Sequence, residues 1–184
     1  MIRDSCLVTS HEARGTFIRR FAEIVKPEYL ESSTWAMGKF RRQFDANKPP
    51  AATLLVVDDE PQNVDLMVDV FENAGYAAIG AGSGAEALEK IRIHRPDAVL
   101  LDLIMPGMDG FEVLRRLRAD ADIRHTPVMV ITAMHVDEAG RDFLALNAQS
   151  IFQKGAFWIE DLLKGVERII AQARDSRDAR RASS

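Results

Sequence analysis

The chain has 184 residues, of which 47% are hydrophobic and 28% are charged, and its formal net charge is −4. The length fits one ordinary domain plus an extension, and the two fractions are typical of a soluble globular protein. The single cysteine, Cys6, excludes an intramolecular disulfide, and the sequence has no apolar run of about 18 residues that would span a membrane. We therefore expect a cytoplasmic protein without membrane contacts.

Charge is distributed unevenly along the chain. Basic residues outnumber acidic ones at both ends of the chain, by nine to six over residues 1–50 and by four to two over residues 173–184. Between them, residues 51–172 contain eleven basic and twenty acidic residues. The acidic middle part opposes non-specific binding of nucleic acid. We predict an N-terminal helical extension and linker over residues 1–50, a folded domain over residues 51–173 and a polar C-terminal tail over residues 174–184.

The first 50 residues show features of packed structure. Between residues 12 and 25, apolar side chains recur at helical spacing, which predicts a helix. Residues 29–44 are rich in aromatic side chains, which argues that they pack against something. Pro49 and Pro50 hold the following backbone extended and indicate a linker.

Beyond the linker, strand and helix patterns alternate five times, and strands separated by helices in this way are parallel. The predicted strands cover residues 53–57, 76–79, 97–101, 127–132 and 150–154. The predicted helices cover residues 61–74, a segment capped by Ser83, and residues 109–119, 137–146 and 157–173. We expect an α/β domain with a five-stranded parallel sheet, followed by a polar run from Arg174 that frays.

Helical spacing also predicts which side chains face the core. The apolar faces contain Val64, Met67, Val68 and Phe71 on the first helix, Ala87, Leu88 and Ile91 on the second, Phe111, Leu114 and Leu117 on the third, and Phe143 on the fourth. On the third helix, Arg115, Arg116 and Arg118 are expected to face water.

Three aspartates stand where the predicted strands end. Asp58 and Asp59 follow the first strand and Asp102 follows the third, and ligands of open α/β sheets bind beyond the carboxyl ends of the strands. One such aspartate is more often a helix cap or turn residue. Two carboxylates about 4 Å apart, however, repel each other by roughly 1 kcal/mol in water and roughly 4 kcal/mol at an effective dielectric of about 20. Three of them call for a compensating cation, and oxygen ligands in a partly open pocket suit Mg²⁺.

This arrangement resembles the receiver domain of two-component response regulators over about residues 53–172. The resemblance rests on the three aspartates and on Met105-Pro106-Gly107-Met108-Asp109-Gly110, Thr132-Ala133 and Lys154. It implies a doubly wound, flavodoxin-like receiver fold with Asp102 as phosphoacceptor, assisted by Thr132 and Lys154. It also implies that Mg²⁺ is bound directly by Asp59 and Asp102, by the backbone carbonyl of Ile104, and through water by Asp58.

By the same resemblance, the protein is a stand-alone signalling switch that catalyses its own phosphorylation. Its phosphoryl donor would be a histidine kinase or a histidine phosphotransferase, and its output would run through an unknown downstream protein or a homodimer, without direct binding of nucleic acid. The alternative is a constitutive scaffold or sequestering module with a degenerate receiver. A hydrolase of the haloacid-dehalogenase type is disfavoured, because it expects an aspartate where this chain has Ile104.

Two positions depart from the pattern of the family. Gly155 follows the lysine where proline is common, which predicts a looser turn. Ile151 stands three residues before the lysine, where an aromatic switch residue is common. Ile104 and Met134 flank the expected phosphate site, and their side chains cannot orient a hydrolytic water. We therefore expect a comparatively long-lived phosphoryl group.

Overall fold

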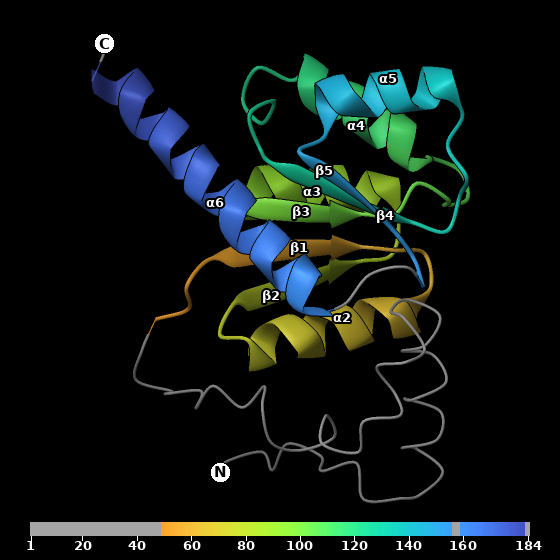
Figure 1. Cartoon of the computed structure of the whole chain (residues 1–184), viewed down its shortest axis with the longest axis horizontal. Helices are drawn as coiled ribbons and strands as arrows, with labels where there is room; N and C mark the ends of the chain where they lie inside the picture. The colour runs from red at the N-terminus through yellow and green to blue at the C-terminus, as the bar shows by residue number, and fades with distance from the viewer. Residues whose placement is uncertain (1–48, 156–158, 183–184) are drawn as a thin grey trace, which may run out of the picture.

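The computed structural model describes residues 49–155 and 159–182, and its centre is one parallel sheet. The strands are β1 (Thr53–Val57), β2 (Ala77–Ala81), β3 (Ala98–Leu101), β4 (Val128–Thr132) and β5 (Ser150–Gln153). Their order in the sheet is β2-β1-β3-β4-β5 (Figure 1). Because the chain winds outward in both directions from β1 and β3, the crevice beyond the carboxyl ends of these two strands is the topological switch point. The predicted doubly wound fold is confirmed.

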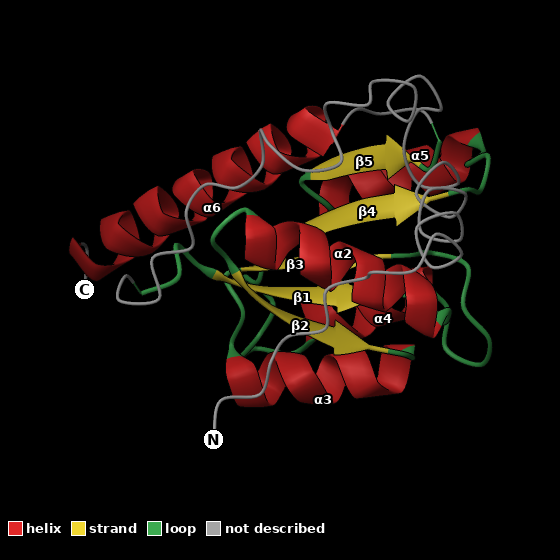
Figure 2. Ribbon diagram, turned by 90° about the horizontal axis from the view of Figure 1, so that it is seen from below, coloured by secondary structure: helices red, strands yellow, loops and turns green. Residues whose placement is uncertain are grey.

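Helices cover both faces of the sheet. They are α2 (Pro61–Asn73), α3 (Gly84–His94), α4 (Gly110–Ala119), α5 (Glu138–Asn147) and α6 (Ile159–Ala182). One apolar cluster joins α2 and α6 to the sheet, and the other joins α3, α4 and α5 to its opposite face. Figure 2 shows α6 and α3 on opposite sides of the sheet. Burial on both faces explains why β3 and β4 are nearly continuous apolar runs.

Short polar side chains set the first residue of three helices. Ser83, Asp109 and Asp137 each accept a hydrogen bond from the backbone N–H three residues later, at 3.3, 2.7 and 2.8 Å. They are therefore N-caps rather than helical residues. This confirms the predicted cap at Ser83 and moves the predicted starts at Asp109 and Asp137 by one residue.

Two predicted boundaries are wrong by more than one residue. Strand β2 runs to Ala81, because Gly80 and Ala81 continue the parallel pairing with β1. Helix α6 continues to Ala182, through the polar run that was expected to fray. Its added turns are held to the domain, since the guanidinium of Arg174 donates to the Ala51 carbonyl at 2.8 Å and that of Arg177 pairs with Asp97 at 3.1 Å.

The helical faces bury most of the predicted side chains. Val64, Met67, Phe71, Ala87, Leu88, Ile91, Leu114 and Leu117 are buried, whereas Val68, Phe111 and Phe143 are half-buried. Phe111 and Phe143 pair across α4 and α5 with ring centroids 5.7 Å apart, and the guanidinium of Arg115 lies 5.5 Å from the Phe143 ring centre. The predicted helix of residues 12–25 and the aromatic segment of residues 29–44 lie outside the described residues. None of the helices within residues 49–155 and 159–182 is long and apolar enough to cross a membrane.

Arg118 does not face water as predicted. Its guanidinium donates to the carbonyls of Asn147, Arg124 and Thr126 at 2.6 to 3.0 Å, and so joins the end of α5 to the loop before β4. Burial lowers the pKa of this side chain. The spacing of apolar and charged residues in α4 gives no sign of these contacts, because all three acceptors lie outside that helix.

We expect Arg118→Leu to lower the free energy of unfolding by about 2–3 kcal/mol, since three carbonyls lose a charged donor. Urea unfolding monitored by circular dichroism measures the change. Arg116→Leu is the matched control on the same helix, because Arg116 is exposed and pairs with Glu112 one turn earlier. That control should cost less than about 1 kcal/mol. Equal losses in the two variants would contradict a structural role for Arg118.

Candidate functional site

The parallel ladders fix the backbone of three polar residues at the carboxyl edge of the sheet. The N–H of Asp58 donates to the Ala81 carbonyl at 3.1 Å, and that of Asp102 donates to the Val57 carbonyl at 3.0 Å. On the other side, the N–H of Lys154 donates to the Thr132 carbonyl at 2.8 Å. Each of these residues therefore extends its strand by one further hydrogen bond, and the structure brings them to the same edge, as predicted.

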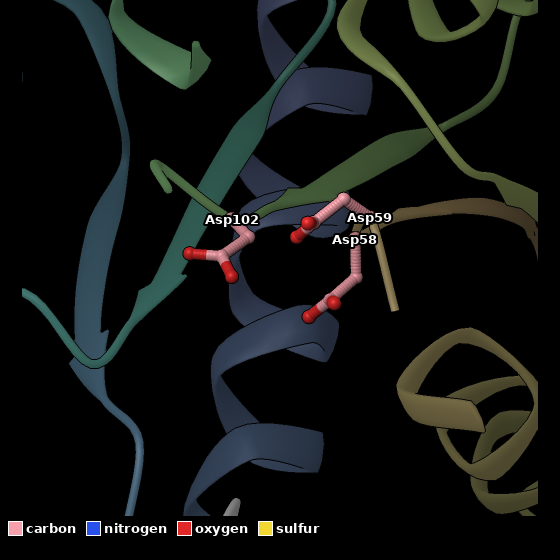
Figure 3. A group of neighbouring side chains, drawn as sticks. All are labelled: Asp58, Asp59 and Asp102. Atoms are coloured by element: carbon pink, nitrogen blue, oxygen red, sulfur yellow. The ribbon is translucent and has the colours of Figure 1, made fainter. Parts of the chain in front are cut away.

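Asp58, Asp59 and Asp102 form one acidic cluster at this edge. One carboxylate oxygen from each lies within 4.8 Å of the others, and Figure 3 shows the three side chains gathered between the ends of β1 and β3. Asp58 and Asp102 are buried, with 6% and 5% of their surface exposed, and Asp59 is half-buried. Three carboxylates this close together, two of them buried, require positive charge nearby.

Lys154 supplies part of that charge. Its Nζ lies 2.7 Å from Asp58 Oδ2 and 2.6 Å from Asp102 Oδ2. Burial alone would lower the pKa of this amine, but its hydrogen bonds to the Asp102 and Asp58 carboxylates, together with their negative charges, outweigh it and hold the Lys154 pKa above its usual value of 10.5. The side chain is therefore an ammonium at neutral pH, shared between two carboxylates.

The second oxygen of each buried aspartate is also hydrogen-bonded. Asp102 Oδ1 accepts from the Ile104 N–H at 3.2 Å. Asp58 Oδ1 accepts from the Glu60 N–H at 3.0 Å and from Asn63 Nδ2 at 3.1 Å. Asn63 is not among the site residues predicted from the sequence. The one feature of the sequence that could have pointed to Asn63 is its place directly before Val64, on the face of α2 that packs on the sheet.

The other positions singled out in the sequence lie on β4, on β5 and in the loops that follow the strands. Thr132 is buried at the end of β4, and its hydroxyl oxygen accepts from the Met134 N–H at 3.1 Å. The Ile104 side chain is 51% exposed. Gly155 has a φ of +76°, a left-handed conformation that favours glycine directly after the lysine. Ile151 stands on β5 with 42% of its surface exposed.

Comparison with known proteins adds to this geometry. The sequence pattern of the response regulator receiver domain matches residues 54–167, well over half of the chain. The chain belongs to the response regulator receiver family. The site described above therefore lies in a domain of two-component signalling, and Asp58, Asp59 and Asp102 form the acidic cluster typical of a receiver Mg²⁺ site.

Individual proteins agree with this assignment. The polar-differentiation response regulator DivK of Brucella anthropi is 40% identical over 81 residues, which cover 44% of this chain and 66% of DivK, and the DivK of Brucella ovis matches equally. The chain thus spans just under two thirds of these relatives. Among solved structures, a receiver domain from Methanoculleus marisnigri is 36% identical with a TM-score of 0.54, covering 66% of this chain and 98% of that domain. The chemotaxis protein CheY4 of Vibrio cholerae is 31% identical with a TM-score of 0.58, covering 64% and 98%.

The donor set of the receiver fits a hard divalent cation. Three carboxylates face one ammonium, so the cluster keeps a net negative charge, and all of its candidate ligand atoms are oxygens. Mg²⁺ is bound in proteins by one or two carboxylates together with waters and substrate phosphate. A cavity of about 390 Å³ between β5 and α6 is less suited to such a cation, because its lining contains only one carboxylate. The lining residues are Phe152, Asp161, Lys164, Gly165 and Arg168.

Gly110 allows the loop after Asp102 to close tightly. Its N–H donates to the Leu103 carbonyl at 3.1 Å, and a Cβ at this position would press against the Asp102 carbonyl oxygen and lie 2.7 Å from the Leu103 Cα. The start of α4 therefore packs directly against the backbone that carries Asp102.

We expect Gly110→Ala to lower the free energy of unfolding by about 1–3 kcal/mol, because backbone atoms must move apart. Backbone amide shifts in NMR spectra should change around Asp102 and Leu103. Gly82→Ala is the control, since the nearest atom to its added Cβ is Glu86 Oε2 at 3.7 Å. If both variants unfold at the same denaturant concentration, the close approach has no energetic consequence.

Proposed function

We propose that this receiver is a response regulator in which Asp102 accepts a phosphoryl group from phosphohistidine on a histidine kinase or histidine phosphotransferase. The observation that supports this most is the pairing of Asp102 with Lys154 inside the acidic cluster. In the reaction, a carboxylate oxygen of Asp102 forms the new O–P bond as the N–P bond of phosphohistidine breaks. The electron pair of that bond returns to the imidazole nitrogen.

Most of the catalytic contribution is positioning and electrostatic. When bound, Mg²⁺ would neutralise charge on the transferring phosphoryl oxygens. Asp59, Asp102 and the Ile104 carbonyl would hold it directly, and Asp58 would do so through water. The Lys154 ammonium lies next to the attacking oxygen, and the Thr132 hydroxyl would turn from the Met134 N–H towards the phosphoryl group.

Phosphorylation would act as a switch by changing the charge of the cluster. A phosphoryl group adds about −1.5 to −2 charges at neutral pH and competes with Asp58 for Lys154. Moving a two-state equilibrium from about 1:99 to 99:1 needs roughly 5.5 kcal/mol of preference for the active form. A new negative charge on Asp102, whose carboxylate lies 2.6 Å from the half-buried Lys154 ammonium, would be a strong local perturbation that favours one form over the other.

The output would run through protein contacts in the cytoplasm, either with a downstream protein or in a homodimer. In this division of the chain, residues 51–173 are the receiver and residues 1–50 and 174–184 are flanking segments. A constitutive scaffold with a degenerate pocket is the second candidate, favoured only by the departures at Ile151 and Gly155.

Acetyl phosphate or beryllofluoride with Mg²⁺ distinguishes the two candidates. For the switch, we expect intact mass spectrometry after treatment with acetyl phosphate to show one added phosphoryl group, mapped to Asp102 after reductive trapping; beryllofluoride instead mimics the phosphoryl group without a covalent change. Light scattering or partner capture should then differ between the treated and untreated full chains. A protein that is not modified and keeps the same partners under both conditions is the scaffold.

The phosphoryl group should be long-lived, because Ile104 and Met134 leave no polar side chain beside it to orient water. Ile104→Asn combined with Met134→Glu should shorten its half-life by about tenfold or more. The half-life is measured after removal of the phosphodonor. Ile93→Asn is the control, since Ile93 is 64% exposed on α3, outside the acidic cluster. A half-life of seconds in the wild-type protein would reject the idea.

A further inference from the structure

Asn63 is a buried polar side chain to which the proposed reaction gives no role. Among the described residues, the polar or charged side chains classed as buried are Asp58, Asn63, Asp102 and Thr132. Three of these belong to the proposed reaction. Asn63 has only 8% of its surface exposed, and its amide donates to Asp58 Oδ1 at 3.1 Å from the first turn of α2.

The amide of Asn63 completes the hydrogen bonding of the Asp58 carboxylate. Asp58 Oδ1 accepts from two donors, the Glu60 N–H and Asn63 Nδ2, while Asp58 Oδ2 accepts from Lys154 Nζ. Rotation of the carboxylate about its own axis would break at least one of these bonds. The plane of the Asp58 carboxylate is therefore fixed from both sides.

This hydrogen bond starts a chain of contacts that reaches the phosphoacceptor. Asn63 contacts Asp58, Asp58 shares Lys154 with Asp102, and the two bonds of Lys154 are 2.7 and 2.6 Å long. If Asp58 turned away, Lys154 would be left with Asp102 alone. A tighter pair of Lys154 and Asp102 would compete with a cation for the same carboxylate.

We propose that Asn63 is a positioning residue for the Mg²⁺ site: it orients Asp58, and through Asp58 it keeps Lys154 shared so that Asp102 stays available. The inference rests on the proposed function for its consequence in phosphoryl transfer, but its effect on the cation site can be measured separately. Outer-shell hydrogen bonds of this kind tune metal sites by fixing the orientation of the ligands.

Packing alone gives a different expectation for this position. The neighbours of Asn63 on α2 include buried Val64, Leu66 and Met67, so an apolar side chain would suit the face at least as well. A structural role therefore predicts that Asn63→Leu changes only stability. The positioning role predicts weaker Mg²⁺ binding in a protein that remains folded.

The test is titration of the full chain with MgCl₂ alone, followed by isothermal calorimetry. We expect Asn63→Leu to raise the Mg²⁺ dissociation constant by about tenfold. Asn63→Ala, which removes the same amide without adding bulk, should do the same if the leucine variant does not fold. Asn63→Gln keeps the amide donor and should recover part of the affinity. Asn73→Leu is the matched control, because Asn73 is exposed at the end of the same helix and donates to the Asp69 carbonyl.

A second measurement separates affinity from chemistry. With acetyl phosphate, the Asn63→Leu protein should need more Mg²⁺ for half-maximal phosphorylation but approach the wild-type rate when Mg²⁺ is saturating. Unchanged Mg²⁺ affinity in a folded Asn63→Leu or Asn63→Ala protein, or a wild-type protein that binds no Mg²⁺, would overturn the inference. If the wild-type protein binds Mg²⁺ but Asp102 is not phosphorylated, the proposed function fails, and the calorimetry still decides the role of Asn63.

Discussion

Asp102→Asn is expected to lower phosphorylation by acetyl phosphate more than about 10³-fold, because the amide that replaces the carboxylate is not a nucleophile at neutral pH. Asp102 is buried, but the fold around it should not change, because the asparagine side chain has nearly the same shape and keeps an oxygen for the Ile104 N–H. Incorporation of labelled phosphate in the presence of Mg²⁺ measures the effect. Circular dichroism of the same samples shows whether the variant is folded.

Asp109→Asn is the matched control for this prediction. It makes the same chemical change seven residues further along the same loop, where Asp109 is exposed and caps α4 through the Glu112 N–H. Asparagine caps helices about as well as aspartate, so stability and labelling should both stay close to wild type. If Asp102→Asn takes up label as readily as Asp109→Asn, Asp102 is not the phosphoacceptor.

Lys154→Met is expected to affect both stability and chemistry. Without Mg²⁺, it leaves Asp58 and Asp102 buried without their shared ammonium, which should cost about 3–5 kcal/mol of unfolding free energy. Added Mg²⁺ should restore much of that loss, because the cation neutralises the same carboxylates. With Mg²⁺ saturating, the rate of phosphorylation should fall by about 10²–10³-fold, as expected when a donor to the transferring oxygens is removed.

The pH dependence of this loss follows from the raised pKa of Lys154. A cation whose pKa is higher in the folded state stabilises that state fully below its unfolded pKa, and the stabilisation disappears as the pH rises through the folded value. The difference between wild type and Lys154→Met in EDTA should therefore be constant near neutral pH and shrink only above its usual pKa of 10.5. Lys164→Met, at an exposed position on α6, should show little difference at any pH. A gap that closes below pH 8 would contradict the raised pKa.

The sequence predicts the centre of the fold well because β1, β3 and β4 are buried on both faces. Their apolar runs leave little choice of structure, and each run ends at a polar residue that must then lie at the carboxyl edge. The convergence of Asp58, Asp59 and Asp102 follows from this topology. The ends of β2 and α6 are predicted poorly, because small residues in one and polar residues in the other lack a strong pattern.

Asn63 and Arg118 each make their hydrogen bonds to residues outside the helix that carries them. Asn63 interrupts an apolar helix face, and its partner is the carboxylate of Asp58 at the end of β1. Arg118 belongs to an arginine-rich stretch, and its acceptors come from α5 and from the loop before β4. Local periodicity contains no information about either partner. Only the packed structure shows why a polar group is stable there.

The contact between Arg174 and the Ala51 carbonyl has a consequence for how partners reach this protein. It joins the extended part of α6 to the segment before β1, on the side of the sheet where the strands begin (Figure 1). The pair of Arg177 and Asp97 lies on the same side, because Asp97 directly precedes β3. The aspartates stand at the opposite ends, about 16 Å away for strands of about five residues. A protein bound to the extended part of α6 would therefore leave the acidic cluster uncovered, so under the proposed function its binding would not exclude phosphorylation of Asp102.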